Sequence, residues 1–168
     1  MTSTQTITEL PFNLPGRIYR SPMPFSPYDP EGELIAAYHR NEVSTIVLLT
    51  PEVECRRLTG KELRPLYAQE GFKVIYLPTP DMQAPSHNDL VRCLTMALDC
   101  AHSGGNLVIH CYAGVGRTGT FAACLAKRIL GLNGDQAIAW VRQFIPMAVE
   151  TKGQRQFVID MLDGGATG

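Results

Sequence analysis

The most informative segment of the chain is Leu107-Val-Ile-His-Cys-Tyr-Ala-Gly-Val-Gly-Arg-Thr-Gly119. A continuous apolar run ends at Ile109, a loop with two glycines follows, and a helical pattern extends from Arg117 to about Leu130. Strands that are covered on both faces are continuous apolar runs, as in the parallel sheets of α/β proteins. The segment therefore predicts a buried strand that passes through a tight loop into a helix.

Outward from this segment, short apolar runs alternate with helical periodicity. Further strands are predicted at Arg17–Arg20, Ile46–Leu49 and Val74–Leu77. Further helices are predicted at Glu31–Asn41, Lys61–Glu70, Leu90–Ala101 and Ala137–Ile145, and after Thr151. The order strand, helix, strand, helix predicts an α/β fold, with a central, mostly parallel sheet of four to five strands flanked by helices.

The length and composition fit one globular unit. With 168 residues, of which 45% are hydrophobic, we expect a single domain over residues 1–168 with a sizeable core. Six of the twelve prolines lie between Pro11 and Pro30, so residues 1–30 are predicted to be an irregular, proline-rich segment that wraps the domain.

Charge and cysteine content exclude several classes of protein. Fifteen Lys and Arg against sixteen Asp and Glu give a net charge of −1, which gives no reason to expect nucleic-acid or membrane binding. Neither a signal-peptide pattern nor a membrane-spanning apolar run is apparent. The odd number of cysteines fits reduced thiols better than disulfides. We expect a cytoplasmic monomer. The five cysteines are Cys55, Cys93, Cys100, Cys111 and Cys124.

The loop contains residues that are suited to cleaving a phosphate ester. A cysteine at a helix N-terminus beside a cation favours the nucleophilic thiolate form, and here that residue is Cys111. Glycine-rich main chain that enters a helix forms an anion site, and the fork of Arg117 can hold two phosphate oxygens. The alternative is that Cys111 is a packing residue and Arg117 is a solvated helix start. This alternative does not explain the acidic loop upstream.

That acidic loop is Pro78-Thr-Pro-Asp-Met-Gln-Ala-Pro85, which follows a predicted strand. Asp81 lies about thirty residues before Cys111. A carboxylic acid that protonates the departing alkoxide or phenoxide contributes about 10²–10⁴-fold to the rate. We therefore predict that Asp81 is the general acid. Asp89 is the other candidate, but its position three residues after Ser86 fits a helix cap better.

The decapeptide from His110 to Gly119 resembles the signature loop of the cysteine-based protein tyrosine phosphatases. The short chain and its Pro-Thr-Pro-Asp81 loop are most similar to compact dual-specificity members, including bacterial ones and the kinase-associated phosphatase group. The resemblance implies that Cys111 forms a phosphocysteine, that Asp81 is first acid and then base, and that neither metal nor cofactor is required. The phosphate would be held by the residues Tyr112, Ala113, Gly114, Val115, Gly116 and Arg117.

The resemblance assigns roles to three further residues. His110 would help to hold the loop and the thiolate, and Thr118 would stabilise the cysteine as a leaving group. Gln154 matches the glutamine that orients the hydrolytic water, but Thr151 followed by Gln154 is equally a capping box. Glu150 stands where tyrosine-specific members carry a first glutamine, and this departure weakens the assignment of Gln154.

The variable positions of the loop bear on the substrate. Tyr112, Ala113 and Val115 offer no cation, which disfavours highly phosphorylated inositol lipids. No counterpart of the tyrosine-recognition loop is found, so we expect a shallow pocket for a phosphorylated protein or peptide. The expected substrates are phosphotyrosine and, with it, phosphoserine or phosphothreonine. Three alternatives remain: a phosphate-binding adaptor of the same fold, a phosphatase of a non-protein ester, and a sulfur-transfer or arsenate-reducing enzyme.

Two further pairs of residues are weaker candidates. Cys55 or Cys124 could form a disulfide with an oxidised Cys111, although buried, unreactive thiols are the more common case. Glu52 and Glu54 occur where related proteins carry a charged loop near the site, but exposed glutamates are the usual outcome.

Overall fold

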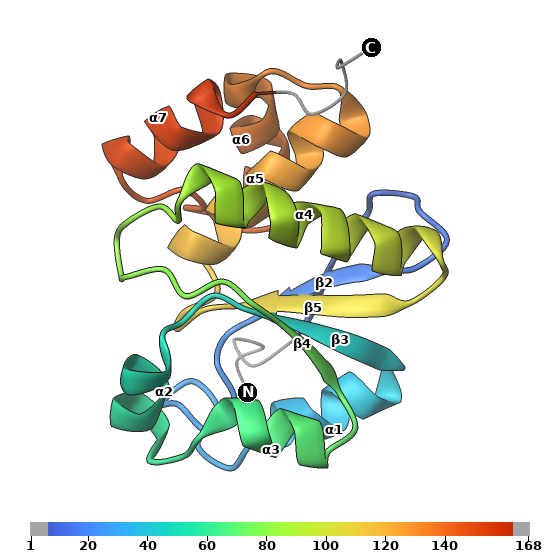
Figure 1. The fold of residues 1–168 in the computed structure, drawn as a ribbon, viewed down its shortest axis with the longest axis vertical. Coiled ribbons are helices and arrows are strands. Elements are labelled where there is room, and N and C mark those ends of the chain that lie inside the picture. The colour runs from blue at the N-terminus through green and yellow to red at the C-terminus, as the bar shows by residue number, and fades with distance from the viewer. Residues whose placement is uncertain (1–6, 163–168) are drawn as a thin grey trace.

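The computed structural model describes residues 7–162, which form a sheet with helices on both faces (Figure 1). The strands are β1 (Thr8–Leu10), β2 (Ile18–Ser21), β3 (Val43–Leu48), β4 (Lys73–Tyr76) and β5 (Asn106–His110). The helices are α1 (Glu33–Arg40), α2 (Glu52–Thr59), α3 (Leu63–Gln69), α4 (His87–His102), α5 (Gly116–Leu130), α6 (Gly134–Arg142) and α7 (Lys152–Asp160). None of the helices in this range combines the length and apolar character that crossing a bilayer requires.

The sheet has five strands in the order β1-β2-β5-β3-β4. The strand β1 is antiparallel to β2, and the other neighbouring pairs are parallel. This confirms the predicted α/β fold with a mostly parallel sheet. Strand β5, which leads into the loop, lies in the centre of the sheet, where parallel strands are covered on both faces.

Three details differ from the sequence prediction. Part of the segment predicted to be irregular forms the short strand β1, while residues 1–6 of that segment lie outside the described range. Helix α2 was not expected from the sequence, because half of its residues are charged and only Cys55 is buried. Helix α6 ends at Arg142, so Phe144 and Ile145 follow it in a turn before Pro146.

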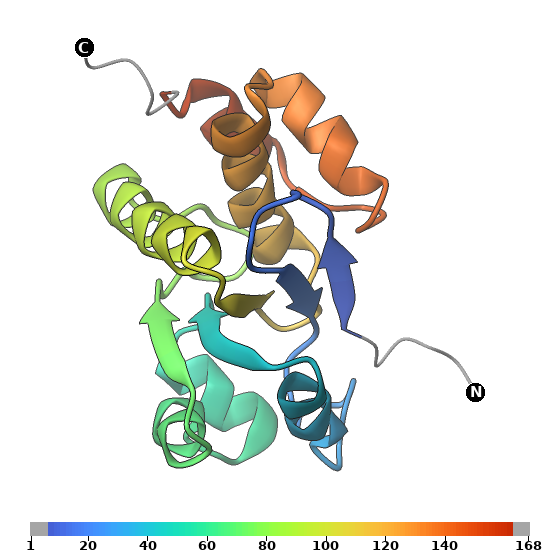
Figure 2. The ribbon, with the colours of Figure 1, turned by 90° about the vertical axis from the view of Figure 1, so that its right-hand side faces the viewer.

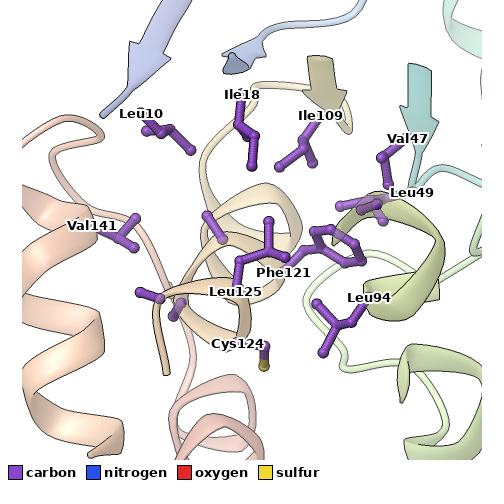
Figure 3. Packing of buried hydrophobic residues seen from close by; sticks show 14 of the residues in the cluster. Leu10, Ile18, Val47, Leu49, Leu94, Ile109, Phe121, Cys124, Leu125 and Val141 are labelled. Atoms are coloured by element: carbon purple, nitrogen blue, oxygen red, sulfur yellow. The ribbon is translucent and has the colours of Figure 1, made fainter. Parts of the chain in front are cut away.

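The helices form two layers. Helices α4 to α7 cover one face of the sheet and α1 to α3 cover the other, as Figures 1 and 2 show. Every residue of α5 from Gly116 to Lys127 is buried, because the sheet and the helices α4, α6 and α7 surround it. In Figure 3, Phe121 and Leu125 of α5 lie between the sheet and the flanking helices. The helix that begins at the candidate site is thus fixed in the core.

The strand register brings the site loops together. His110 at the end of β5 pairs with Leu48 of β3 and Ser21 of β2, and Leu48 pairs in turn with Tyr76 of β4. The carboxyl ends of four parallel strands therefore lie level at one edge of the sheet. Ligands of open α/β sheets bind at this edge. The Cys111 loop, the start of α2 and the Asp81 loop all begin there.

Candidate active site

Cys111 is the first residue after β5 and lies at the N-terminal end of α5. Its side chain is withdrawn from bulk solvent, with the residue 3% exposed. The hydroxyl Oγ1 of Thr118 donates a hydrogen bond to Cys111 Sγ over 3.1 Å. The N-terminal end of a helix favours negative charge because its first N–H groups lack intrahelical partners. Helix and hydroxyl thus both stabilise a thiolate at this position.

Arg117 is buried, with the residue 4% exposed, and its guanidinium contacts three other residues. Its Nη1 and Nη2 donate to the two carboxylate oxygens of Glu54 over 3.1 and 2.7 Å. Nη1 also donates to the carbonyl of Thr79 over 2.9 Å, and Nη2 lies 3.4 Å from Asp81 Oδ1. Burial lowers the pKa of Arg117, but the hydrogen bond to Glu54 and the charges of neighbouring acidic groups outweigh it, so the pKa lies above its ordinary value. The guanidinium is permanently charged and fixed in direction.

Glu54 is the residue that the sequence analysis undervalued. We expected Glu52 and Glu54 to be exposed, but the side chain of Glu54 is only 13% exposed and forms the forked ion pair with Arg117. Glu52 behaves as expected, since its side chain is 51% exposed and pairs with Arg64 at 3.5 Å. The difference arises because α2 begins at the carboxyl edge of the sheet and turns only Glu54 towards α5. The charged segment near the site is therefore part of it.

Asp81 lies on an extended loop that follows β4, and it faces Arg117. Its side chain is 63% exposed, and Oδ1 accepts a hydrogen bond from the main-chain N–H of Met82 over 3.0 Å. The carboxyl group of Asp81 is thus exposed to solvent and lies beside the guanidinium of Arg117. The rival acid Asp89 instead forms the cap of α4, where its N–H donates to Ser86 Oγ over 3.3 Å. The structure therefore brings Asp81, and not Asp89, to Arg117.

His110 is completely buried beneath the loop, and its tautomer follows from its partners. Nδ1 lies 2.9 Å from the carbonyl oxygen of Cys111, and Nε2 lies 2.7 Å from the hydroxyl of Tyr67. Burial lowers the pKa of His110 to about 4, so the ring is neutral at pH 7. A carbonyl only accepts, so Nδ1 donates to it and Nε2 accepts from Tyr67. His110 thus supports the main chain of Cys111.

The far side of the loop is fastened by Arg20, which the sequence analysis did not single out. Its guanidinium donates to the carbonyls of Gly114, over 2.8 and 3.1 Å, and of Ala113, over 3.1 Å. Gly114 has a φ of 77°, and a Cβ atom there would lie 2.4 Å from the carbonyl oxygen of Ser21. The turn therefore requires glycine. The bonds from Arg20 fix the carbonyls of Ala113 and Gly114 and so hold this side of the loop in one conformation.

An open hollow adjoins the loop on the side of α6. Its lining consists of Ala113, Val115, Arg142, Met147, Val149 and Glu150. The guanidinium of Arg142 donates to the carbonyls of Ala148 and Val149 over 2.9 and 3.1 Å. Met147 is 77% exposed, so the hollow presents apolar surface to solvent. Of the two charged residues in the lining, the cation is already engaged by main chain and the other is the carboxylate of Glu150.

Gln154 lies in the capping box of α7, as its spacing from Thr151 predicted. Its side chain also reaches the Asp81 loop, because Nε2 donates to the carbonyl of Gln83 over 3.2 Å. The residue is 1% exposed. The structure confirms the cap, and the bond to Gln83 brings the side chain of Gln154 to the Asp81 loop.

The remaining thiols near α2 and α5 are not activated. Burial raises the pKa of Cys55 to about 12 and that of Cys124 to about 12. Cys124 lies in the core between α5 and its neighbours (Figure 3). Both groups are thiols at neutral pH. Within residues 7–162, no three His, Cys, Asp or Glu side chains are placed to share a metal ion.

A cysteine and an arginine in one loop between a central strand and a buried helix, with a facing carboxyl group, define a phosphate-ester site of the cysteine-dependent class. The family model described as "Polymorphic toxin system, DSP-PTPase phosphatase" matches residues 29–129, more than half of the chain. The chain belongs to this family and is an enzyme of the cysteine-dependent, dual-specificity phosphatase type. This confirms the resemblance seen in the sequence.

Curated relatives match a part of their own length. Dual specificity protein phosphatase CDC14A of Mus musculus is 33% identical over 106 residues, which are 62% of this chain and 16% of that protein. Protein tyrosine phosphatase domain-containing protein 1 of Bos taurus is 41% identical over 66 residues, which are 39% of this chain and 8% of that protein. The matched region thus spans less than a fifth of either relative.

Solved structures match over nearly the whole chain. The structure described as "Crystal structure of Tk-PTP in the active form" has a TM-score of 0.77 and 28% identity, and the match covers 95% of this chain and 98% of that one. Kinase associated phosphatase with serine in place of its catalytic-site cysteine has a TM-score of 0.81 and 21% identity, with 94% of both chains covered. The second match concerns the fold alone.

Proposed function

We propose that this enzyme hydrolyses phosphotyrosine, together with phosphoserine or phosphothreonine, in proteins through a phosphocysteine intermediate. One observation carries the proposal. Arg117 lies in the same loop as Cys111, and its Nη2 is 3.4 Å from Asp81 Oδ1. Nucleophile, phosphate-binding cation and candidate acid are thus assembled at one end of α5. The names of the relatives, a dual specificity protein phosphatase among them, agree with this substrate class.

In the first step, the thiolate of Cys111 attacks phosphorus and the bond to the ester oxygen breaks. The sulfur–phosphorus bond forms as the leaving oxygen takes a proton from Asp81. Arg117 and the N–H groups of the loop compensate the charge of the phosphoryl oxygens. Because Thr118 hydrogen-bonds to Sγ over 3.1 Å, the thiolate is held in position before the substrate arrives.

In the second step, water attacks the phosphocysteine and the sulfur–phosphorus bond breaks. Asp81, now a carboxylate, takes the proton of that water, and inorganic phosphate forms. The sulfur leaves as a thiolate, and the hydroxyl of Thr118 stabilises that charge. His110 is neutral and bonds to the carbonyl of Cys111, so it contributes to the position of the loop and transfers no proton.

The surroundings of the loop support a protein substrate. The hollow beside it offers the apolar surface of Val115 and Met147, and its cation Arg142 is engaged by main-chain carbonyls. A substrate with a second phosphate would meet the carboxylate of Glu150 there. Tyr112 packs edge-on against Tyr28 with ring centroids 5.1 Å apart, which gives the entrance an aromatic side. Peptide side chains fit such a surface better than a highly phosphorylated inositol.

The test measures initial rates of phosphate release from matched phosphotyrosine and phosphothreonine peptides. We expect Cys111→Ser to abolish release, and Asp81→Asn to reduce it by about 10²–10⁴-fold. Cys100→Ser is the matched control, since Cys100 lies near Ser44 and Thr45 at the opposite edge of the sheet. Undiminished release by Cys111→Ser would contradict the mechanism. Phosphate binding without release by the unaltered enzyme would favour an adaptor, and release only from other esters would exclude a protein substrate.

A further inference from the structure

The geometry points to Gln154 as a positioning residue that holds the Asp81 loop in place for proton transfer to the leaving group. This inference rests on the proposed function, because it concerns the acid of that reaction. It gives Gln154 a role in the first step of the reaction, through the loop and without contact to the reacting atoms.

The side-chain amide of Gln154 is bound by main chain on both of its ends. Oε1 accepts from the N–H groups of Glu150 and Thr151 over 2.9 and 3.2 Å, which closes the cap of α7. Nε2 donates to the carbonyl of Gln83 over 3.2 Å. Thr151 adds a parallel contact, since its hydroxyl lies 3.3 Å from the carbonyl of Met82. The first turn of α7 thus bonds to two successive carbonyls of the acid loop.

These two carbonyls directly follow Asp81, and the loop is also fastened before it. The carbonyl of Thr79 accepts from Arg117 over 2.9 Å, and the N–H of Thr79 donates to the carbonyl of Leu49 over 3.0 Å. Met82, whose carbonyl is one of the fastened groups, has a φ of 65°. This left-handed conformation is unfavourable for a residue with a side chain, so it persists only where contacts impose it. The exposed Asp81 therefore depends on ties on both sides of it.

The capping box of helix α6 provides a comparison for the role of Gln154. There Asn133 and Gln136 form the same reciprocal pair, with bonds of 2.9 and 3.0 Å. Gln136 is exposed, whereas Gln154 is 1% exposed. The cap alone thus accounts for Oε1 of Gln154 but not for its burial or for the bond from Nε2 to Gln83. The bond to Gln83 comes from the acid loop, and the burial comes from the face of α7 that also carries the buried Val158.

The basicity of the leaving group distinguishes a positioning role of Gln154 from a role in orienting water and from a general structural defect. An acid matters most for a basic leaving group such as a tyrosine phenoxide or an alkoxide, and little for a weakly basic, fluorinated phenoxide. A glutamine that only orients the hydrolytic water acts after the phosphocysteine forms, so it alters kcat and leaves kcat/KM unchanged. A general structural defect lowers kcat/KM equally for both kinds of substrate.

The experiment compares Gln154→Glu and Gln154→Met with the same two substitutions at Gln136. Glu keeps an oxygen that can accept the hydrogen bonds of the cap, but it lacks the amide that donates to Gln83. Met also lacks this amide and carries no charge. We expect kcat/KM for a phosphotyrosine peptide to fall about tenfold in both Gln154 variants, the worth of one hydrogen bond. The value for a fluorinated aryl phosphate should change by less than about twofold, the pattern of Asp81→Asn. The Gln136 variants, which report the cost of the cap alone, should leave both values unchanged.

The outcomes separate this inference from the proposed function. Equal losses of kcat/KM for both substrates would overturn the positioning role, and so would an unchanged kcat/KM with a burst of product and a lower kcat. Either result leaves the phosphatase reaction itself intact. If the unaltered enzyme releases no phosphate from either substrate, the proposed function fails and the inference fails with it. Thermal unfolding of each Gln154 variant and of its Gln136 counterpart shows that both proteins are folded when their rates are compared.

Discussion

The ion pair between Glu54 and Arg117 permits a quantitative prediction. Glu54→Gln removes one charge and keeps the size and one oxygen acceptor. The two side chains are 13% and 3% exposed, so the pair is nearly buried. Removal of one partner from a buried ion pair costs about 3–5 kcal/mol. Because Gln retains an acceptor and the carbonyl of Thr79 still binds Arg117, we expect a loss of about 2–3 kcal/mol in the free energy of unfolding.

Thermal unfolding followed by circular dichroism measures this loss. For a chain of 150–250 residues, each kcal/mol lowers Tm by about 2–4 °C, so Glu54→Gln should lower Tm by about 4–12 °C. Glu52→Gln, two residues away, is the matched control. Its pair with Arg64 is half-exposed at 3.5 Å, and such pairs contribute about 0–1 kcal/mol. Equal Tm values for the two variants would refute the view that Glu54 compensates a buried arginine.

Three further predictions concern the support of the loop. Tyr67→Phe leaves Nε2 of His110 without its partner in the core, so the free energy of unfolding should fall by about 1–3 kcal/mol in urea titrations; no change would contradict a stabilising hydrogen bond between Tyr67 and His110. Gly114→Ala places a Cβ 2.4 Å from the carbonyl oxygen of Ser21 at a φ of 77°, so Tm and phosphate release should both fall, whereas Gly116→Ala meets only the movable end of a glutamate and should change Tm little. The pKa of His110 is about 4 in the folded chain, below the ordinary value of 6.5, so its contribution to stability is complete above pH 6.5 and is lost as the pH falls towards 4. Urea titrations at pH 7 and pH 5 should show a loss of about 2 kcal/mol, which arises over the 1.5 pH units below pH 6.5, and a flat profile would count against a neutral, buried His110.

The sequence predicted those parts of the fold whose pattern is local. Continuous apolar runs located β3, β4 and β5, and periodicity located α4 and the start of α6. Helix α2 was missed because half of Glu52–Thr59 is charged and its apolar side is limited to Cys55 and the partly buried Leu58. The helix depends on contacts with α3 and α5. Strand β1 was missed because three residues carry no period, and only the pairing with β2 defines them as a strand. Tertiary contacts, absent from any window of sequence, decide both elements.

The same distinction holds for the candidate site. Cys111, Arg117 and Thr118 lie within eight positions of one another, and the proline-rich loop marked Asp81. Glu54 and Arg20 belong to segments 63 and 94 positions from their partners in the loop, so nothing local connects them to it. The position of Glu54 in the sequence could have predicted that it lies near the site. It follows β3, a strand that was predicted, and loops after parallel strands meet at one edge of the sheet.

In the proposed reaction, the contacts of Arg117 determine which of its N–H groups can bind a phosphate. Nη1 is occupied by Glu54 and by the carbonyl of Thr79, and Nη2 by Glu54 and, more loosely at 3.4 Å, by Asp81. These four contacts do not use Nε, so the fork formed by Nε and the proton facing Asp81 is the side that can hold two phosphate oxygens. A substrate would then displace Asp81 from Arg117 and leave the Glu54 pair intact. Since the loop is fastened on both sides of Asp81, the displaced carboxyl group stays beside the phosphate, where the leaving oxygen needs its proton.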